Sequence, residues 1–237
     1  MVRFLVPLKE KSSMEEKGVI ITGATGMVGG CALRICLNSP DVSMVTSIGR
    51  SRTGVKDDKL REIILDDFTD YSKATDALQD QDVALFCLGV YTGAVPDDEF
   101  RRITVDYMSA FAEALYKVSP DCSFCFLSGQ GADQTEKSRV AFARNKGIAE
   151  NGLLAIGFPR AHIFRPGYIY PVTPRKEPNL LYSISRFLYP LLRRIYPNIG
   201  IPSKDLAAAM VQAGLYGTGE HQSPVLENRD IRTMKVL

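Results

Sequence analysis

The sequence predicts an α/β fold: a doubly wound parallel sheet of about six to seven strands, with helices on both faces and a small C-terminal addition. Short apolar runs alternate with segments of helical periodicity through most of the 237 residues. The first apolar run ends at Gly23, Gly26 and Gly29, whose spacing is typical of a tight turn from strand to helix. A composition that is 45% hydrophobic and 24% charged suits one domain with a substantial core.

The glycine turn predicts a nucleotide site. Residues 19–21 are apolar without a polar interruption, so they are expected to form a buried strand. After it, Gly23 permits the sharp turn, Gly26 lets a pyrophosphate approach the backbone, and Gly29 lets the next helix pack closely on the sheet. Amide groups near Met27, at the positive end of that helix, would face the phosphates. The alternative is a surface turn followed by a helix of small residues.

The remaining elements follow in chain order. A helix is expected directly after the glycine turn, and another at 98–118, where apolar residues recur every four positions. A closing helix is expected at 202–216, with Ser203 or Asp205 as its N-cap. This alternation is typical of parallel strands with helices on both faces. Further strands are expected at residues 42–50, 61–68, 82–89, 123–131 and, as a sixth, 163–169.

Charge and hydropathy exclude several classes of partner. Residues 1–17 are expected to form a flexible extension, and residues 18–237 a single domain. A net charge of +2 is too near zero to indicate nucleic acid as a partner. No apolar run approaches the length that spans a membrane, so no transmembrane segment is expected. Because no signal segment is recognised, the cytoplasm is the expected location.

Five cysteines in a chain without a secretion signal are expected to stay reduced. Cys122 and Cys125 form a CxxC pair inside a predicted strand, where positions three apart point to opposite faces. The chain has only two histidines. No metal site is therefore expected.

The end of the second strand bears on the choice of nicotinamide cofactor. An NAD-binding turn usually has Asp or Glu here to bind the ribose 2′-hydroxyl, whereas this chain has Arg50 and Arg52. A planar, permanently charged guanidinium suits a 2′-phosphate, so NADP(H) is preferred over NAD(H). The alternative for Arg52 is an ordinary solvated loop charge. Asp67 is expected either to line the adenine pocket or, like Asp66, to cap the next helix.

A series of motifs, in this order, resembles the short-chain dehydrogenase/reductase superfamily in its atypical, extended-like branch. The series consists of the glycine turn, Arg50, Cys87-Leu88-Gly89, Ser128, Lys146 and Arg165-Pro166-Gly167. More narrowly, the chain resembles the HIV Tat-interactive oxidoreductase family and its microbial and fungal relatives, in LFCLG, FLSGQGAD, NKGIAE, FRPG and VLENRDIR. The resemblance covers nearly all of residues 17–232 and implies a Rossmann fold with a bound NAD(P) cofactor.

The resemblance also implies a reductase site of serine, tyrosine and lysine. In that chemistry the tyrosine protonates the carbonyl oxygen, the lysine holds the nicotinamide ribose and lowers the tyrosine pKa, and the serine bonds the developing oxyanion. Ser128 matches the serine and Lys146 the lysine, but Phe142 stands at the tyrosine position and has no proton to give. The residues expected to bind the cofactor are Gly23, Thr25, Gly26, Met27, Gly29, Arg50, Arg52, Asp67, Leu88, Gly89, Lys146, Gly167 and Ile169.

Two interpretations of the function stay open. The first is an NADP(H)-dependent oxidoreductase for an unknown carbonyl substrate, with a displaced proton donor. Tyr91, Tyr168 and Tyr170 are candidates for that donor, although each is better explained as a pocket wall. The second is a catalytically weak or inactive NADP(H)-binding regulatory protein that acts through a protein partner. Phe142 favours the second interpretation, and the intact Ser128 the first.

The C-terminal third is expected to hold any substrate specificity. Residues 170–200 are expected to form a substrate-side lid region, with an aromatic and aliphatic helix pattern at 180–197. The alternatives for this pattern are a basic amphipathic surface for a membrane or protein partner and a core-facing helix with solvated arginines. Long helices that begin near Asp98 and Arg139 are compatible with the homodimer of extended-like members.

Overall fold

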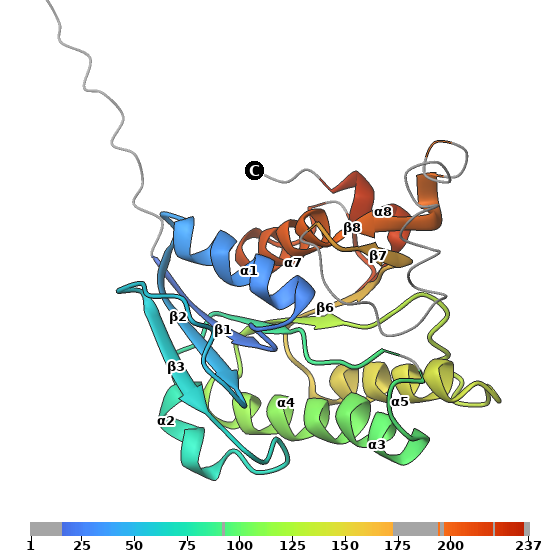
Figure 1. Cartoon of the computed structure of the whole chain (residues 1–237), viewed down its shortest axis with the longest axis horizontal. Coiled ribbons are helices and arrows are strands. Elements are labelled where there is room, and N and C mark those ends of the chain that lie inside the picture. The colour runs from blue at the N-terminus through green and yellow to red at the C-terminus, as the bar shows by residue number, and fades with distance from the viewer. Residues whose placement is uncertain (1–15, 92, 173–193, 195–196, 220, 235–237) are drawn as a thin grey trace, which may run out of the picture.

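A computed structural model of the chain describes residues 16–91, 93–172, 194, 197–219 and 221–234. Seven parallel strands form one sheet, in the order β3-β2-β1-β4-β5-β6-β9 (Figure 1). The doubly wound sheet predicted from the sequence is therefore confirmed. In chain order the strands are β1 (Lys17–Thr22), β2 (Val42–Gly49), β3 (Leu60–Ile64), β4 (Val83–Phe86), β5 (Ser123–Leu127), β6 (Arg160–Arg165) and β9 (Val225–Glu227).

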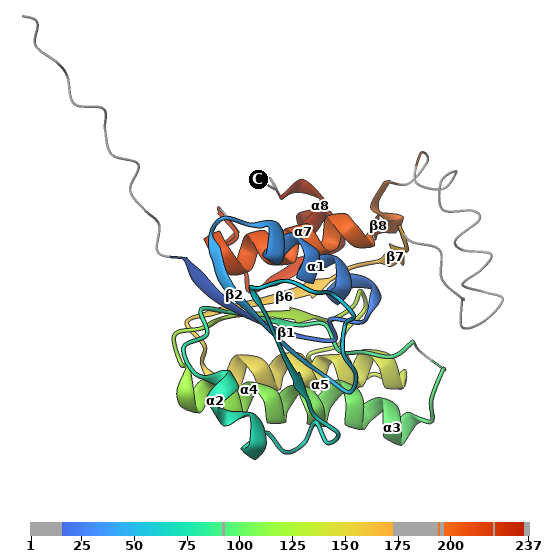
Figure 2. The same cartoon turned by 60° about the vertical axis from the view of Figure 1, so that its left-hand side comes forward.

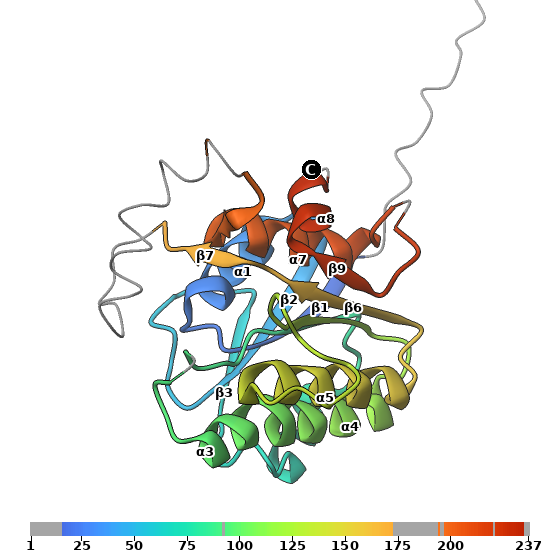
Figure 3. The same cartoon turned by 90° about the vertical axis from the view of Figure 1, so that its right-hand side faces the viewer.

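Helices cover both faces of this sheet (Figures 2 and 3). One face carries α1 (Met27–Asn38), α7 (Ser203–Tyr216) and α8 (Asn228–Thr233). The other carries α2 (Thr75–Leu78), α3 (Asp97–Arg101), α4 (Tyr107–Val118) and α5 (Ala141–Ile156). Two further strands, β7 (Tyr168–Tyr170) and β8 (Gly200–Pro202), form a second, two-stranded parallel sheet in the C-terminal third of the chain.

Two apolar clusters, one on each face, explain the continuous apolar strands. Val19 and Ile21 pack into the cluster under α1 and α7, whereas Ile20 packs into the cluster under α4 and α5. A strand buried on both faces needs apolar residues at every position. Cys125 lies in the first cluster and Cys122 in the second, so the expectation that this pair points to opposite faces is confirmed.

The helix expected at 98–118 is present with an irregular interior. A π-helical turn at Arg102–Asp106 joins α3 to α4. Such turns often occur at functional sites. This one packs against α5, the helix that carries Phe142 and Lys146.

Several predicted boundaries differ from the structure. The expected sixth strand is split into β6 and β7, because Pro166 has no amide hydrogen to continue the ladder. The N-cap of α7 is Pro202, so the cap expected from Ser203 or Asp205 is wrong. Ser203 Oγ instead accepts a hydrogen bond from the amide of Val172, at 3.3 Å.

Parts of two expected segments lie outside the described residues. These parts are residues 1–15 of the N-terminal extension and residues 173–193 and 195–196 of the lid region, with most of its helix pattern. The extension was expected to reach residue 17, yet Lys17 already belongs to β1. Its Nζ donates a hydrogen bond to the carbonyl of Leu215.

Candidate functional site

The glycine turn brings the end of β1, the end of β4 and the start of α1 into contact. Gly23 has a φ of +76°, a left-handed conformation that glycine adopts readily, and a Cβ there would lie 2.8 Å from the carbonyl carbon of Cys87. A Cβ on Gly29 would overlap with the carbonyl oxygen of Gly23. A Cβ on Gly26 would come close only to the carbonyl oxygen of Gly23, at 3.0 Å. The backbone is therefore compact beneath Gly26, with room for a ligand above it.

The start of α1 has the properties of an anion site. Gly26 is the N-cap, no side chain caps the helix, and its first turn contains no acidic residue. The amides of Met27 and Val28 lie in that turn, whose amides have no partner within the helix itself. With the positive end of the helix dipole behind them, such amides suit a pyrophosphate. The turn therefore fits a dinucleotide cofactor.

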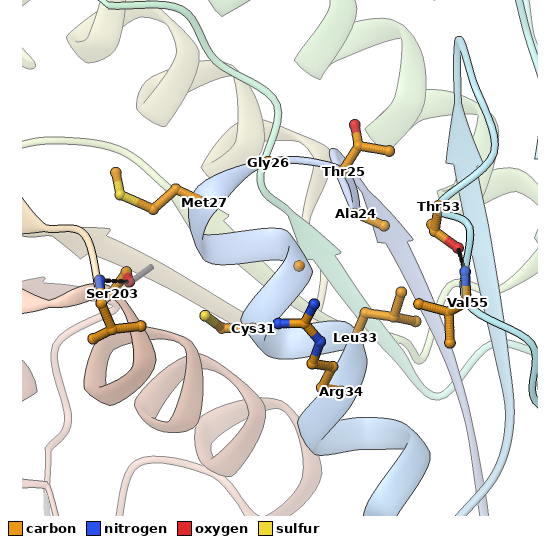
Figure 4. Close-up of a pocket in the computed structure, with 12 residues that line it drawn as sticks. Ala24, Thr25, Gly26, Met27, Cys31, Leu33, Arg34, Thr53, Val55 and Ser203 are labelled. Carbon is orange, nitrogen blue, oxygen red and sulfur yellow. Dashed lines mark hydrogen bonds between the residues drawn. The ribbon is translucent and has the colours of Figure 1, made fainter. Parts of the chain in front are cut away.

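A cavity of about 330 Å³ adjoins this turn and continues along the outer side of α1 (Figure 4). Met27, Cys31 and Arg34 line it from α1, and Thr53 and Val55 from the loop after β2. Figure 4 shows the Arg34 side chain running back along the helix toward Cys31. Sequence analysis missed Arg34, although its spacing from Met27 and Cys31 places all three on one helix face.

The two arginines after β2 have different surroundings. Arg52 Nη1 lies 3.6 Å from Glu62 Oε2, and the Arg52 side chain is largely exposed. Glu62 also accepts a hydrogen bond from the amide of Thr53, which is the largest cause of its lowered pKa. Arg50 is exposed and makes no side-chain hydrogen bond or ion pair with the residues that the structure describes. Arg50 is therefore the freer of the two cations.

Asp67 stabilises a local turn in this structure. Its Oδ1 accepts hydrogen bonds from the amide and hydroxyl of Thr69, at 2.9 and 2.7 Å, and these bonds lower its pKa. The helix cap expected from Asp66 or Asp67 is wrong, because Asp70 bonds the amide of Ser72 at the start of the next 3₁₀ turn.

The other residues expected at the cofactor lie after the ends of β4 and β6. Leu88 and Gly89 follow β4, and the Leu88 amide nitrogen would lie 3.0 Å from a Cβ on Gly23. The amide of Gly167 donates to Asn228 Oδ1 at 2.9 Å, and Ile169 lies in β7. Because parallel strands end at one edge of the sheet, these residues share that edge with the glycine turn.

Ser128, directly after β5, is bonded to a buried carboxylate. Its Oγ donates to Glu150 Oε1 at 2.5 Å, and Glu150 is completely buried on α5. A buried carboxylate needs charged partners, and Arg165 supplies two hydrogen bonds, Nε to Oε1 at 2.9 Å and Nη2 to Oε2. Such a paired carboxylate is an acceptor only, so the Ser128 hydroxyl hydrogen is held away from any ligand.

Arg165 extends this network to the C-terminal strand. Its Nη1 donates to Glu227 Oε1 at 3.0 Å, and the two carboxylates raise the pKa of the guanidinium. Asn228 bonds Gly167 and, through Nδ2, the carbonyl of Asn198 at 3.1 Å. Sequence analysis missed Glu150, Glu227 and Asn228 as site residues, although they stand in the NKGIAE and VLENRDIR motifs.

Lys146 is buried one turn before Glu150 on α5. Its Nζ donates to the carbonyl of Leu127 at 3.0 Å and lies 5.0 Å from the centre of the Phe126 ring. Burial lowers the pKa of Lys146 to about 8, against the opposing effect of the Glu150 charge. A buried lysine with this pKa loses its proton far more readily than an exposed one.

Phe142 lies on the same stripe of α5 as Lys146 and Glu150, because the three residues are four apart. Its ring pairs with Phe100, with centroids 6.2 Å apart, and its Cζ lies 2.6 Å from where a Cβ on Gly129 would be. Ser128, Lys146 and Phe142 are thus all gathered at the end of β5. Tyr168 and Tyr170 lie further on, in β7.

The loop after Ser128 packs directly on α5. The amide of Asp133 donates to the carbonyl of Ala143 at 2.9 Å, and a Cβ on Gly147 would overlap with the carbonyl oxygen of Asp133. Asp133 also accepts hydrogen bonds from the hydroxyl and amide of Thr135 and from the amide of Ser138, and these bonds lower its pKa. Gly147, next to Lys146, therefore lets the loop lie close to α5.

Two curated relatives match most of the chain. Rat Protein HTATIP2 is 29% identical over 229 residues, which are 96% of this chain and 93% of that protein. Protein fmp52, mitochondrial, of Aspergillus clavatus is 29% identical over 211 residues, 83% of this chain and 86% of that protein. No family model matches the chain.

The expected cytoplasmic location is contradicted by these relatives. Several of the fungal relatives are named as mitochondrial proteins. The expectation relied on the lack of a recognised signal segment, and such a lack does not identify a compartment. Among the described residues, no helix has the length and apolar character that crossing a membrane requires.

Solved structures match the fold. A short chain dehydrogenase family protein from Francisella tularensis has a TM-score of 0.62 at 15% identity and covers 92% of this chain and all of that one. MoeE5 in complex with UDP-glucose and NAD has a TM-score of 0.61 at 17% identity, over 89% of this chain and 75% of that one. The chain is therefore similar to Protein HTATIP2 in sequence, and its Rossmann-like fold is similar to that of solved short-chain dehydrogenases.

Proposed function

We propose that the protein is an NADP(H)-binding oxidoreductase that reduces a carbonyl substrate without the usual tyrosine. The glycine cradle at the uncapped start of α1 is the observation that carries this proposal. It fits a pyrophosphate, and the neighbouring cavity has the free cation Arg34 beside it. The likeness of the fold to MoeE5, solved in complex with NAD, supports the choice of a nicotinamide cofactor.

The preference for NADP(H) relies on Arg50. Its guanidinium follows β2, where the ribose of the adenosine half would lie. The other arginine, Arg52, already forms an ion pair with Glu62. An unpaired guanidinium is suited to bond a 2′-phosphate through two parallel hydrogen bonds. No acidic residue stands between Gly49 and Arg52 to repel that phosphate.

The bound cofactor would supply a hydride, and the chain would orient the substrate. Lys146 is placed to bond the nicotinamide ribose diol while it keeps its bond to Leu127. The backbone after β4 and at Gly167 would line the nicotinamide. Phe142 adds an apolar wall beside Gly129.

A regulatory protein that binds NADP(H) and acts through a protein partner is the second candidate. Two observations favour it. Phe142 has no hydroxyl, and the Ser128 hydrogen is given to Glu150, so neither side chain donates to a carbonyl oxygen. Homodimer formation through α4 and α5 stays a prediction under either candidate.

Calorimetric titration of the purified protein with NADPH and with NADH tests the proposal. We expect tight binding of NADPH and weaker binding of NADH. Gly29→Ala should abolish binding of both, because the new Cβ would overlap with the Gly23 oxygen. Gly89→Ala is the matched control, since no atom lies within 4 Å of its added Cβ. A wild-type protein that binds neither nucleotide would contradict both candidate functions.

A further inference from the structure

We propose that Lys146 is the proton donor of this site, in the role that the tyrosine hydroxyl has in related reductases. The proposal rests on the proposed NADP(H)-dependent reduction. Two observations support it: the position of Lys146, and the hydrogen bonds in which the neighbouring side chains already use their own hydrogens. The polar side chains that meet at the end of β5 include Ser128, Lys146, Glu150 and Arg165.

Three of these four side chains are unable to protonate an oxygen at neutral pH. Ser128 gives its only hydrogen to Glu150, at 2.5 Å. Both oxygens of Glu150 accept hydrogen bonds from Arg165, so this carboxylate is engaged as an acceptor. The Arg165 guanidinium keeps its proton throughout the physiological range, and its two carboxylate partners raise its pKa further. Phe142 has no proton to offer.

Lys146 has N–H hydrogens to donate, and it lies on the helix that carries Phe142. An ammonium group carries three hydrogens, and the carbonyl of Leu127 accepts one of them at 3.0 Å. Two remain for a cofactor ribose and a substrate oxygen. Lys146 lies one helical turn from Phe142, whose Cζ is the atom that would carry the missing hydroxyl. Lys146 and the ring that would carry that hydroxyl therefore lie on the same face of α5.

The surroundings also give Lys146 a suitable acidity. Burial lowers its pKa to about 8, and the Glu150 charge one turn away prevents a further fall. The Arg165 charge on β6 is balanced by Glu150 and by Glu227 on β9. A general acid works best when its pKa is near the working pH, which an exposed lysine does not achieve.

The proposed step is balanced in atoms and electrons. The substrate carbonyl carbon takes a hydride from the reduced nicotinamide, and the π pair moves to the oxygen. That oxygen forms an O–H bond with a proton from Nζ, whose N–H bond breaks with the pair left on nitrogen. The products are an alcohol, the oxidised nicotinamide and a neutral Lys146, which takes a proton from solvent.

The first measurement needs no cofactor. The pKa of Lys146 is read from the pH dependence of its acylation by acetic anhydride, with peptide-level mass spectrometry on the folded protein. We expect a value about two units below that of Lys117, which is exposed on α4. Glu150→Gln should lower the Lys146 value further, because the supporting charge is removed. A Lys146 pKa equal to that of Lys117 would overturn the proposal.

The second measurement follows NADPH oxidation with 9,10-phenanthrenequinone as the carbonyl probe. The wild-type rate should fall as pH rises through about 8, because the ammonium form is the acid. Lys146→Arg keeps a donor for the ribose but has no proton to release, so NADPH should still bind while kcat falls by about 10²–10⁴-fold. Lys117→Arg is the matched control and should change neither NADPH binding nor kcat.

The outcomes separate this proposal from the proposed function. Failure of the wild-type protein to bind NADPH in the titration would overturn both. NADPH binding with quinone reduction that Lys146→Arg leaves unchanged would overturn only the role of Lys146. NADPH binding with no reduction of the quinone would overturn that role and favour the regulatory candidate over the reductase. Should Glu150→Gln fail to fold, the Lys146→Arg comparison and the acylation of the wild-type protein still decide the question.

Discussion

The Phe142 ring lies against Gly129, the residue that follows Ser128. An ideal Cβ on Gly129 would stand 2.6 Å from Phe142 Cζ, closer than carbon atoms approach without a shift. The ring also pairs with Phe100 on α3. The aromatic side chain at position 142 therefore occupies space that is open only because residue 129 is glycine, although it carries no hydroxyl.

Gly129→Ala should displace the Phe142 ring and destabilise the protein. The added methyl group meets a ring that Phe100 prevents from moving freely, and such overpacking typically costs about 1–3 kcal/mol. Urea unfolding of the variant and of Gly89→Ala, with open space at its Cβ, measures the difference. Equal stability of the two variants would show that the Phe142 ring moves aside at little cost in stability.

Phe142→Tyr should increase carbonyl reduction. The new hydroxyl starts from Cζ beside Gly129, one turn from Lys146, and a positioned general acid contributes about 10²–10⁴-fold to the rate. NADPH oxidation with 9,10-phenanthrenequinone measures the gain. Phe100→Tyr is the matched control, because it adds a hydroxyl to the partner ring. A parent rate that Phe142→Tyr leaves unchanged would mean that the acid already present is sufficient.

Arg50→Ala should weaken NADPH binding about 10- to 100-fold and change NADH binding little. The variant loses a charged hydrogen bond to the 2′-phosphate, worth about 1.5–3 kcal/mol, and NADH lacks that phosphate. Arg52→Ala is the control, since Glu62 already engages that guanidinium. Calorimetric titration measures all four affinities. Equal weakening of NADPH and NADH would contradict the assignment of Arg50 to the 2′-phosphate.

His162→Leu should reduce the loss of stability in mild acid. His162 is buried on β6, where burial and then the Arg160 charge lower its pKa from 6.5 to about 4. The unfolded chain therefore binds this proton first, and stability falls as the pH drops from 6.5 toward 4. The contribution is about 3 kcal/mol across that range.

Urea unfolding at about pH 4.5 and about pH 7 tests the His162 prediction. The wild-type protein should lose more stability between the two conditions than His162→Leu does. His221, which is exposed, provides the control variant His221→Leu. A wild-type loss matched by His162→Leu would assign the acid sensitivity to other groups.

Much of the fold could be predicted because its signals are local. The apolar run before Gly23, the glycine spacing and the period of α4 each lie within a short window. The structure ends β3 and β4 earlier than predicted, since apolar residues continue into the turns after these strands. The π-helical turn at Arg102–Asp106 gives no pattern that distinguishes it from an ordinary helix.

The polar network of the site was harder to predict. Ser128 and Lys146 could be picked out by the resemblance of their motifs, but Glu150 was not recognised as the partner of Ser128, 22 residues away. The pairing of Arg165 with Glu227 joins residues 62 apart in the chain. A sequence shows the charges, and only the topology of the sheet brings β6 and β9 side by side.

The order in which the site is synthesised follows from the Glu227 and Asn228 contacts. These two residues hold Arg165 and Gly167, yet a ribosome makes them after every other part of the site. The nascent chain can form the glycine turn and bury Lys146 early, while Arg165 still lacks its second carboxylate. A chain stopped before Val225 would lack Glu227 and Asn228, so Arg165 would keep Glu150 but lose its second carboxylate, and the site is complete only when β9 joins the sheet.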